Sequence, residues 1–223
     1  LIIKKKRILF ETFDPINGSS LVREISLENY FKHNFLSLIE EFLDKNVFDI
    51  EKKLKNFIKK IYIIIESDSF FKVESSIKNN PNGINFNHDQ LKESLIDIKN
   101  EFEKNSQRYE IIHMIINRYT VNGVDYETLP ENVDGDDLVI QLKFICLENK
   151  IVDNLTRIFS KYEISINQII SYEYLKSLNN FSSKNITKIA YDTIDGHNEN
   201  EVFIVKKTFK KQGFFEKFFN FFN

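Results

Sequence analysis

The sequence has little of the residues that form disulfides or glycine-rich loops. Its 223 residues include one cysteine, Cys146, which excludes a disulfide framework and predicts a reducing compartment. Cys146 lies inside the apolar run 142–147, a setting typical of a small core residue rather than of a catalytic nucleophile. Only six glycines occur, although loops that wrap nucleotide phosphates need glycine where the backbone approaches the ligand. The composition therefore argues against a disulfide-stapled protein and against a glycine-loop nucleotide site.

Signals for nucleic-acid binding, secretion and catalysis are also missing. The formal net charge is −2, whereas a nucleic-acid-binding domain would be basic. No apolar run of signal-peptide length follows the charged residues 4–7, so we expect no secretion signal. The histidines are dispersed, and none has a serine or cysteine partner at motif spacing: they are His33, His88, His113 and His197. We expect a protein that is not an enzyme, with no catalytic residues and no cofactor, and with His113 on the face of a strand.

Two acidic clusters raise the question of a metal site. One combines five residues within ten positions: Asp192, Asp195, His197, Glu199 and Glu201. Its spacing fits neither a calcium-binding loop nor a His-Glu-X-X-His zinc helix, so it favours a solvated hairpin loop. The other cluster, Asp134, Asp136 and Asp137, is predicted to be a turn. We therefore predict no metal ligands.

Hydrophobic periodicity predicts an α+β fold. Helical spacing of apolar residues predicts helices over 27–45, 49–59, 148–161 and 172–179, and a further helix that begins at 87 or 88 and includes Phe102. Strands are predicted over 61–65, 70–77, 109–117, 119–127, 138–147, 163–170, 186–192 and 201–207, with extended segments in 8–27 around a turn at 14–18. This alternation predicts small mixed sheets with helices packed on one face.

The carboxyl-terminal residues carry the most informative pattern. At about 100° per residue of helix, six phenylalanines share one arc of roughly 160°: they are Phe214, Phe215, Phe218, Phe219, Phe221 and Phe222. Five basic residues accompany them: Lys206, Lys207, Lys210, Lys211 and Lys217. An apolar face with a basic flank is typical of a helix that lies in a membrane surface. We predict that these eleven residues bind an anionic membrane.

The alternative is a terminal helix that packs into the protein core, as aromatic stripes at helical spacing commonly do. Membrane binding is favoured by burial of each phenylalanine, worth about 1.5–3 kcal/mol, and by about 1 kcal/mol for each nearby lysine. A helix this short is unstable in water, where about 12–15 residues are needed, and cannot span a bilayer, which needs about 20. We therefore expect reversible, peripheral binding at the cytoplasmic face of the cell membrane.

Several segments resemble, in order, parts of a known family. They are Lys60-Ile-Tyr-Ile-Ile-Ile-Glu-Ser67, His113-Met-Ile-Ile-Asn-Arg-Tyr-Thr-Val-Asn-Gly123, Leu138-Val-Ile-Gln-Leu-Lys-Phe-Ile-Cys146, Ile151-Val-Asp-Asn-Leu-Thr-Arg-Ile-Phe159 and Glu163-Ile-Ser-Ile-Asn-Gln-Ile-Ile170. The order is similar to that of the small insertion domain, called 1C, of FtsA, the bacterial actin-like cell-division protein. The resemblance implies an actin-like (1A-type) segment over 1–70, a 1C-like insertion over 71–170, a returning helix and strand hairpin over 171–207, and a membrane-targeting helix over 208–223.

The chain departs from that family where ATP binds. FtsA holds ATP between two glycine-rich phosphate loops, whose nearest counterparts here are 14–20 and 192–198, and neither has the family's run of glycines. The resemblance therefore implies a shortened, non-enzymatic adaptor of the division apparatus. Its implied partners are the membrane, division proteins such as FtsZ or later components of the divisome at the septum, and further copies of itself. The alternatives are a degenerate nucleotide-binding ATPase and an adaptor for pilus or secretion assembly.

Overall fold

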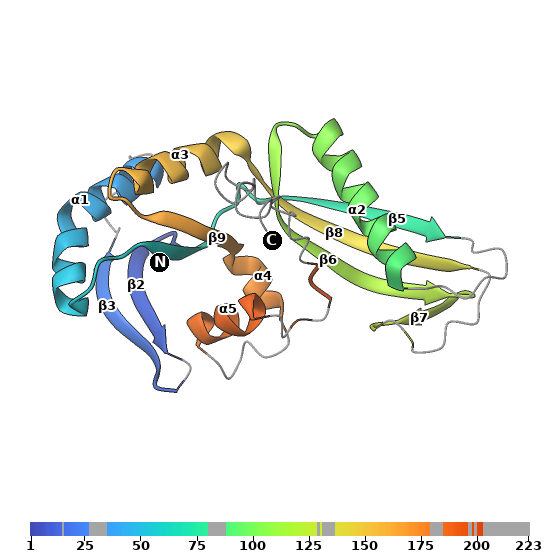
Figure 1. Ribbon diagram of the computed structural model, residues 1–223, viewed down its shortest axis with the longest axis horizontal. Coiled ribbons are helices and arrows are strands. Elements are labelled where there is room, and N and C mark those ends of the chain that lie inside the picture. Colours follow the sequence, from blue (N-terminus) through green and yellow to red (C-terminus); the bar gives the residue numbers. More distant parts are fainter. Residues whose placement is uncertain are drawn as a thin grey trace, which may run out of the picture.

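The computed structural model describes residues 1–14, 16–26, 35–79, 88–128, 130, 137–178, 185–195, 198 and 200–202. They form a mixed α+β fold with two sheets and five helices, which confirms the α+β part of the predicted fold class (Figure 1). The predicted terminal helix at 208–223 lies outside the described residues.

The first sheet has the strand order β3-β2-β1-β4-β9. Its strands are β1 (Ile2–Lys4), β2 (Arg7–Asp14), β3 (Gly18–Ser26), β4 (Lys60–Ile65) and β9 (Ser165–Ser171). The first three strands pair antiparallel, whereas β4 runs parallel to β1 and β9 runs parallel to β4. The sheet thus joins the beginning of the chain to a strand that follows about a hundred residues after β4.

Helices cover both faces of this sheet, because its central strands are apolar on both sides. Ile3 packs with α1 (Phe35–Leu54) and α3 (Asn149–Ser160), and its neighbour Ile2 packs on the other side with α4 (Tyr172–Ser177) and α5 (Ile186–Ile194). Successive side chains of a strand point to opposite faces. Our prediction of helices on one face was therefore wrong for this sheet.

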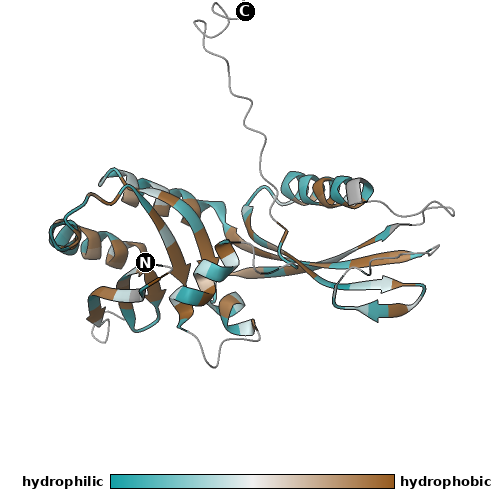
Figure 2. Ribbon diagram, turned by 60° about the horizontal axis from the view of Figure 1, so that its bottom comes forward, coloured by the Kyte–Doolittle hydropathy of each residue, from teal (hydrophilic) through white to brown (hydrophobic). Residues whose placement is uncertain are grey.

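The second sheet is antiparallel, with the order β5-β8-β6-β7. Its strands are β5 (Phe71–Asn79), β6 (Tyr109–Val121), β7 (Val124–Tyr126) and β8 (Leu138–Glu148), and α2 (His88–Asn105) packs on one face (Figure 2). Asn122 and Gly123 have φ of 50° and 81°, the conformation that a two-residue hairpin turn requires between β6 and β7.

The second sheet is an insertion in the first. The chain leaves the first sheet after β4, builds β5, α2, β6, β7 and β8, and returns through α3 to β9. The predicted helix at 148–161 and strand at 163–170 exist as α3 and β9. α3 packs on the first sheet and β9 pairs with β4 of that sheet, so neither is part of the insertion. The inserted unit therefore ends near residue 148, earlier than the boundary at 170 that we predicted.

The structure differs from the predicted elements in three places. The helices predicted at 49–59 and in the described part of 27–45 are one helix, α1, and β6 continues through the break expected near residue 118. The strand predicted at 186–192 is a helix, α5, so the predicted hairpin is wrong. The Asn185 side chain accepts the Thr187 backbone N–H at 2.9 Å, and burial of Ile189 and Ala190 against the sheet overrides the strand preference of the β-branched residues.

Candidate functional site

The predicted membrane-binding residues lie outside the described part of the chain, which ends at Val202. These residues are Phe214, Phe215, Phe218, Phe219, Phe221, Phe222, Lys206, Lys207, Lys210, Lys211 and Lys217. Because the structure does not describe them, the membrane helix stays a prediction. The described helices include none that is long and apolar enough to cross a membrane.

The most concentrated polar chemistry lies where the two sheets meet. His113 comes from β6 in the second sheet, Ser171 ends β9 in the first sheet, and Tyr174 belongs to α4. Asn198 and Glu201 follow α5. We call these five residues the junction cluster. The side chains of His113 and Glu201 are 0% and 2% exposed, so this histidine–carboxylate pair is sealed from solvent, whereas Asn198 is partly buried.

The hydrogen bonds fix where the protons of the junction cluster lie. The Ser171 backbone N–H donates to His113 Nε2 at 3.0 Å, so this ring nitrogen carries no proton. His113 Nδ1 therefore donates to Glu201 Oε1 at 2.7 Å. The Tyr174 hydroxyl donates to the other carboxylate oxygen at 2.6 Å and accepts from Asn198 Nδ2 at 2.6 Å. Burial, together with the Glu201 charge, raises the pKa of Tyr174.

This arrangement makes the junction cluster structural rather than catalytic. A general base needs a free nitrogen within reach of a substrate proton, but a backbone N–H occupies His113 Nε2 and the ring is buried. A buried carboxylate is tolerable only when donors satisfy it, and Glu201 has two. The cluster therefore joins three segments that are distant in the sequence.

The junction also fixes the chain that leads to residue 203. Val202 N–H donates to the Met114 carbonyl at 2.8 Å, and Ile116 N–H donates to the Asn200 carbonyl at 2.7 Å. Glu201 and Ile115 thus form an antiparallel bridge on the edge of β6. Beneath it, Ile115 and Ile145 of the second sheet pack in one apolar core with first-sheet residues such as Ile64.

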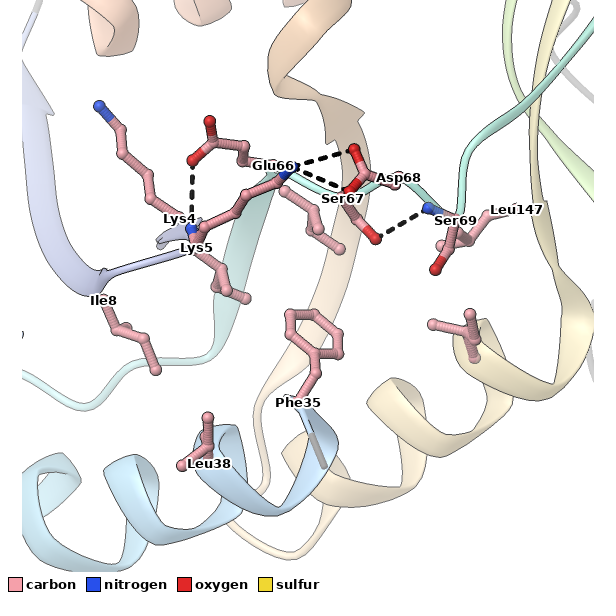
Figure 3. A pocket seen from close by; sticks show the side chains of 13 residues that line it. Lys4, Lys5, Ile8, Phe35, Leu38, Glu66, Ser67, Asp68, Ser69 and Leu147 are labelled. Carbon is pink, nitrogen blue, oxygen red and sulfur yellow. Dashed lines mark hydrogen bonds and ion pairs between the residues drawn. The ribbon is translucent and has the colours of Figure 1, made fainter. Parts of the chain in front are cut away.

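A shallow pocket of about 390 Å³ lies at the carboxyl ends of β1 and β4 (Figure 3). Its rim carries Lys5, whose backbone N–H donates to Glu66 Oε2 at 3.1 Å and whose ammonium lies 2.9 Å from Asp68 Oδ2. Its wall is apolar and includes Phe35 and Leu38. Asp68 raises the pKa of the Lys5 ammonium through this ion pair. The opposite charges on the rim neutralise each other, which does not favour a charged ligand.

The β2–β3 hairpin contains the start of the segment 14–20, one of the two that the resemblance compares with phosphate loops, and its geometry is that of a closed turn. Asp14 Oδ1 accepts the backbone N–H of Ile16 at 2.8 Å and that of Asn17 at 2.9 Å. These two bonds lower the pKa of Asp14. A phosphate would need backbone N–H groups that point at it. Here the protein's own carboxylate takes two of them.

Other residues singled out from the sequence are separated in space. Cys146 is fully buried in β8, and burial raises the pKa of its thiol to about 12, which suits the predicted role as a core residue. Asp192 pairs with Lys188 on α5 at 3.3 Å, whereas Glu201 is buried at the junction. The prediction that Glu201 lies in a solvated loop was wrong. Within the described residues, no three His, Cys, Asp or Glu side chains gather as metal ligands would.

Sequence reasoning placed His113 on a strand but missed its partners. His113 and Glu201 are 88 positions apart, and His113 lies 58 positions from Ser171. No local spacing signals such pairs. The only hint was a histidine within an apolar strand, which must find a partner when buried.

No protein-family model matches this sequence, and no curated protein shows a significant match to it.

Proposed function

We propose that this protein is a non-enzymatic adaptor of the bacterial division apparatus, related to FtsA and held at the cytoplasmic face of the inner membrane. The observation that carries the proposal is the arc of six phenylalanines with its lysine flank at 206–222. Such a segment gains apolar burial and electrostatic attraction together at an anionic surface. In this proposal the terminal segment binds lipid and the folded part binds protein.

The topology of the chain supports the FtsA-like part of the proposal. A separate sheet with its own helix is inserted between β4 and α3 of the first sheet, as the resemblance to an actin-like segment with a 1C insertion implies. The closed turn at Asp14 supports a relative that does not bind nucleotide, because the N–H groups of Ile16 and Asn17 are already used.

The inserted sheet offers a surface for protein partners. Its edge strand β7 exposes Val124 and Tyr126, which are 54% and 39% exposed, and β5 at the other edge exposes Phe71. Open strand edges with apolar side chains are sites where other chains can pair. We propose that division proteins, FtsZ or later components among them, or a second copy of this chain bind there.

The junction cluster would connect the two activities. It fixes residues 198 and 200–202 against β6 and α4, so the described chain ends at the point where both sheets meet, five residues before the predicted membrane segment at 208–223. Binding at the inserted sheet and attachment at the membrane would then involve segments that this buried group brings together.

Co-sedimentation with vesicles tests the membrane part. We expect the wild-type chain to pellet with phosphatidylglycerol-containing vesicles, less with pure phosphatidylcholine vesicles, and less at high salt. The variant F218D/F219D should stay in the supernatant, because it places two charges in the apolar arc. The variant N220D/N223D is the matched control: it adds the same charge outside the arc and should still bind. Equal pelleting of wild type and F218D/F219D would refute the membrane proposal.

Calorimetric titration with ATP separates the adaptor from its main rival. A degenerate actin-like ATPase that still binds nucleotide would give a measurable affinity, whereas the adaptor should give none. A pilus or secretion adaptor would lack the membrane-binding terminal helix. Vesicle binding by the wild-type chain would therefore argue against that alternative.

A further inference from the structure

The strand β5 forms an open edge of the second sheet (Figure 1). It pairs with β8 over nine residues in one regular register, and no strand lies on its other side within the described part of the chain. Edge strands are commonly protected by shortness, proline, bulges or charge, because their free N–H and C=O groups can pair with another chain. Of these features β5 has charge alone, at positions 72, 74 and 78.

The two faces of β5 differ in chemistry. Val73 and Ile77 point to the side of α2 and pack at the margin of that core. Phe71 lies on the same side by alternation, stacks on Tyr109 with ring centroids 5.1 Å apart, and is 47% exposed. The opposite face is exposed and polar, with Lys72, Glu74, Ser76 and Lys78. A strand that pairs with β5 must therefore bring an apolar row to one face and matching charges to the other.

Two of the charges on β5 are available to a partner. Lys78 already lies 3.5 Å from Asp137. Lys72 and Glu74 form no ion pair with any residue that the structure describes, although Glu74 stands opposite Lys143 in the register with β8. They flank Val73, so β5 presents one cation and one anion symmetrically about an apolar residue.

A second copy of the same strand supplies the matching pattern. Two copies that pair antiparallel about a two-fold axis place one residue opposite its own counterpart and repeat every other contact twice. With Val73 on the axis, Lys72 of each copy faces Glu74 of the other. On the apolar face Val73 meets Val73, and Phe71 of each copy faces Ser75 of the other. Opposite charges and apolar residues that face each other across strands are stabilising.

The other two-fold registers with an axis between 72 and 76 match less well. An axis at Lys72 or at Glu74 sets two like charges directly opposite each other, which is destabilising. An axis at Ser75 does the same with Lys72 and Lys78. An axis at Ser76 sets Glu74 opposite Lys78, which already contacts Asp137. Only the axis at Val73 pairs the two available charges with each other.

We propose that the edge of β5 is a self-association surface, at which a second copy of this chain pairs antiparallel about Val73 and joins two four-stranded sheets edge to edge. This inference rests on the proposed function in that it selects one of the partners suggested there for this edge. The overlap covers residues 71–75 of each copy, because β5 begins at Phe71. Such a short contact is weak in solution and gains strength where many copies share one membrane surface.

Cysteine cross-linking tests the position of the axis. Val73→Cys places two thiols opposite each other in the proposed register, whereas Ser76→Cys does so only with the axis at Ser76. Cys146 can stay in place because it is buried. Opposite residues of paired strands are close enough for a disulfide, so mild oxidation should convert V73C to a covalent dimer, and the wild type and S76C should stay monomeric. Equal cross-linking of S76C would overturn the Val73 axis. No covalent dimer of V73C, in solution or on vesicles, would overturn the surface itself.

Charge reversal tests the pairing of Lys72 with Glu74. Lys72→Glu and Glu74→Lys each create two like-charge contacts, since the axis repeats every change, and each should weaken dimerisation about tenfold or more. The double variant K72E/E74K restores opposite charges and should return dimerisation close to the wild-type level. Lys78→Glu is the control, because it changes the net charge as K72E does but lies outside the overlap. Sedimentation equilibrium over a concentration series measures each dissociation constant.

Two results of the charge series would contradict the proposal. If K72E/E74K dimerises no better than either single variant, the two residues do not face each other. If K78E weakens dimerisation as much as K72E does, the axis is not at Val73. Hydrogen exchange adds a third check: protection of the amides of 71–75 should rise with protein concentration, and protection that is complete at every concentration would show that something else covers this edge.

These experiments separate self-association from the membrane part of the proposed function. Dimerisation is measured without lipid, and F218D/F219D should dimerise as the wild type does, because its changes lie outside β5. A chain that pellets with vesicles but gives no V73C dimer would refute self-association alone. A chain that dimerises but does not pellet would refute membrane binding alone.

Discussion

Replacing Tyr174 by Phe removes one hydroxyl from the junction cluster and keeps the ring. The hydroxyl donates to Glu201 at 2.6 Å and accepts from Asn198 at 2.6 Å, so its loss leaves a buried carboxylate with one donor fewer. A hydrogen bond to a charged group contributes about 1.5–3 kcal/mol. We expect Tyr174→Phe to lower the free energy of unfolding by this amount.

The loss should be visible in both thermal and chemical unfolding. For a chain of this size each kcal/mol corresponds to about 2–4 °C, so the melting temperature should fall by roughly 3–12 °C. Tyr126→Phe is the matched control, because that side chain is exposed on β7, and it should change stability by less than about 0.5 kcal/mol. Hydrogen exchange of the Ile116 and Val202 amides should become faster in Tyr174→Phe alone, because they bond across the junction.

A double-mutant cycle decides whether Tyr174 acts through Glu201. Tyr174→Phe, Glu201→Gln and the double variant should give a coupling energy of about 0.5–3 kcal/mol. Effects that add to within about 0.3–0.5 kcal/mol would refute the assignment of this hydrogen bond, whatever the size of each loss.

The same variant has a pH signature. The pKa of Tyr174 is raised above the ordinary value of 10.0, so the unfolded state loses its proton first as the pH rises. The stability linked to this tyrosine is thus complete below pH 10 and declines above it. Tyr174→Phe should make the alkaline decline shallower.

Two further predictions concern residues outside the junction. Cys146 is buried, so at pH 8 a thiol reagent such as Ellman's should leave the native protein unmodified and label one thiol per chain after denaturation; rapid native labelling would contradict its burial. Burial raises the pKa of the Cys146 thiol from 9.0 to about 12, so the unfolded state loses this proton first as the pH rises. The stability linked to the neutral thiol is therefore complete below pH 9 and is lost as the pH rises towards 12. Asp14→Ala should speed exchange of the Ile16 and Asn17 amides, whereas Asp14→Asn should largely preserve them. The pKa of Asp14 is lowered, so in the wild type the protection of these two amides from hydrogen exchange should fade as the pH drops below 3.8. If Asp14→Ala leaves their exchange unchanged, the carboxylate does not hold this turn.

The secondary structure was predictable where burial imposes a strong period. β8 alternates buried and partly buried residues over most of its length, and α3 buries Leu155, Ile158 and Phe159 at helical spacing. Prediction failed at α5, whose many β-branched residues favour a strand locally, while contact with the sheet decides for a helix. It also failed inside α1, where the predicted helices 27–45 and 49–59 left a break around Asn46. Instead, Asn46 is buried and its amide donates to the Phe42 carbonyl at 2.8 Å.

The sequence by itself determined the α+β class, most element positions and the aromatic pattern at the carboxyl terminus, because each depends on residues within a few turns or one strand. Only the tertiary structure decided that β9 pairs with β4 across the inserted sheet, and that His113 meets Glu201 and Tyr174. The physical reason is that a local pattern encodes which side of an element is buried, but not what covers it. Partners distant in the sequence are chosen by the packing of the whole chain, and the junction cluster arises at that level.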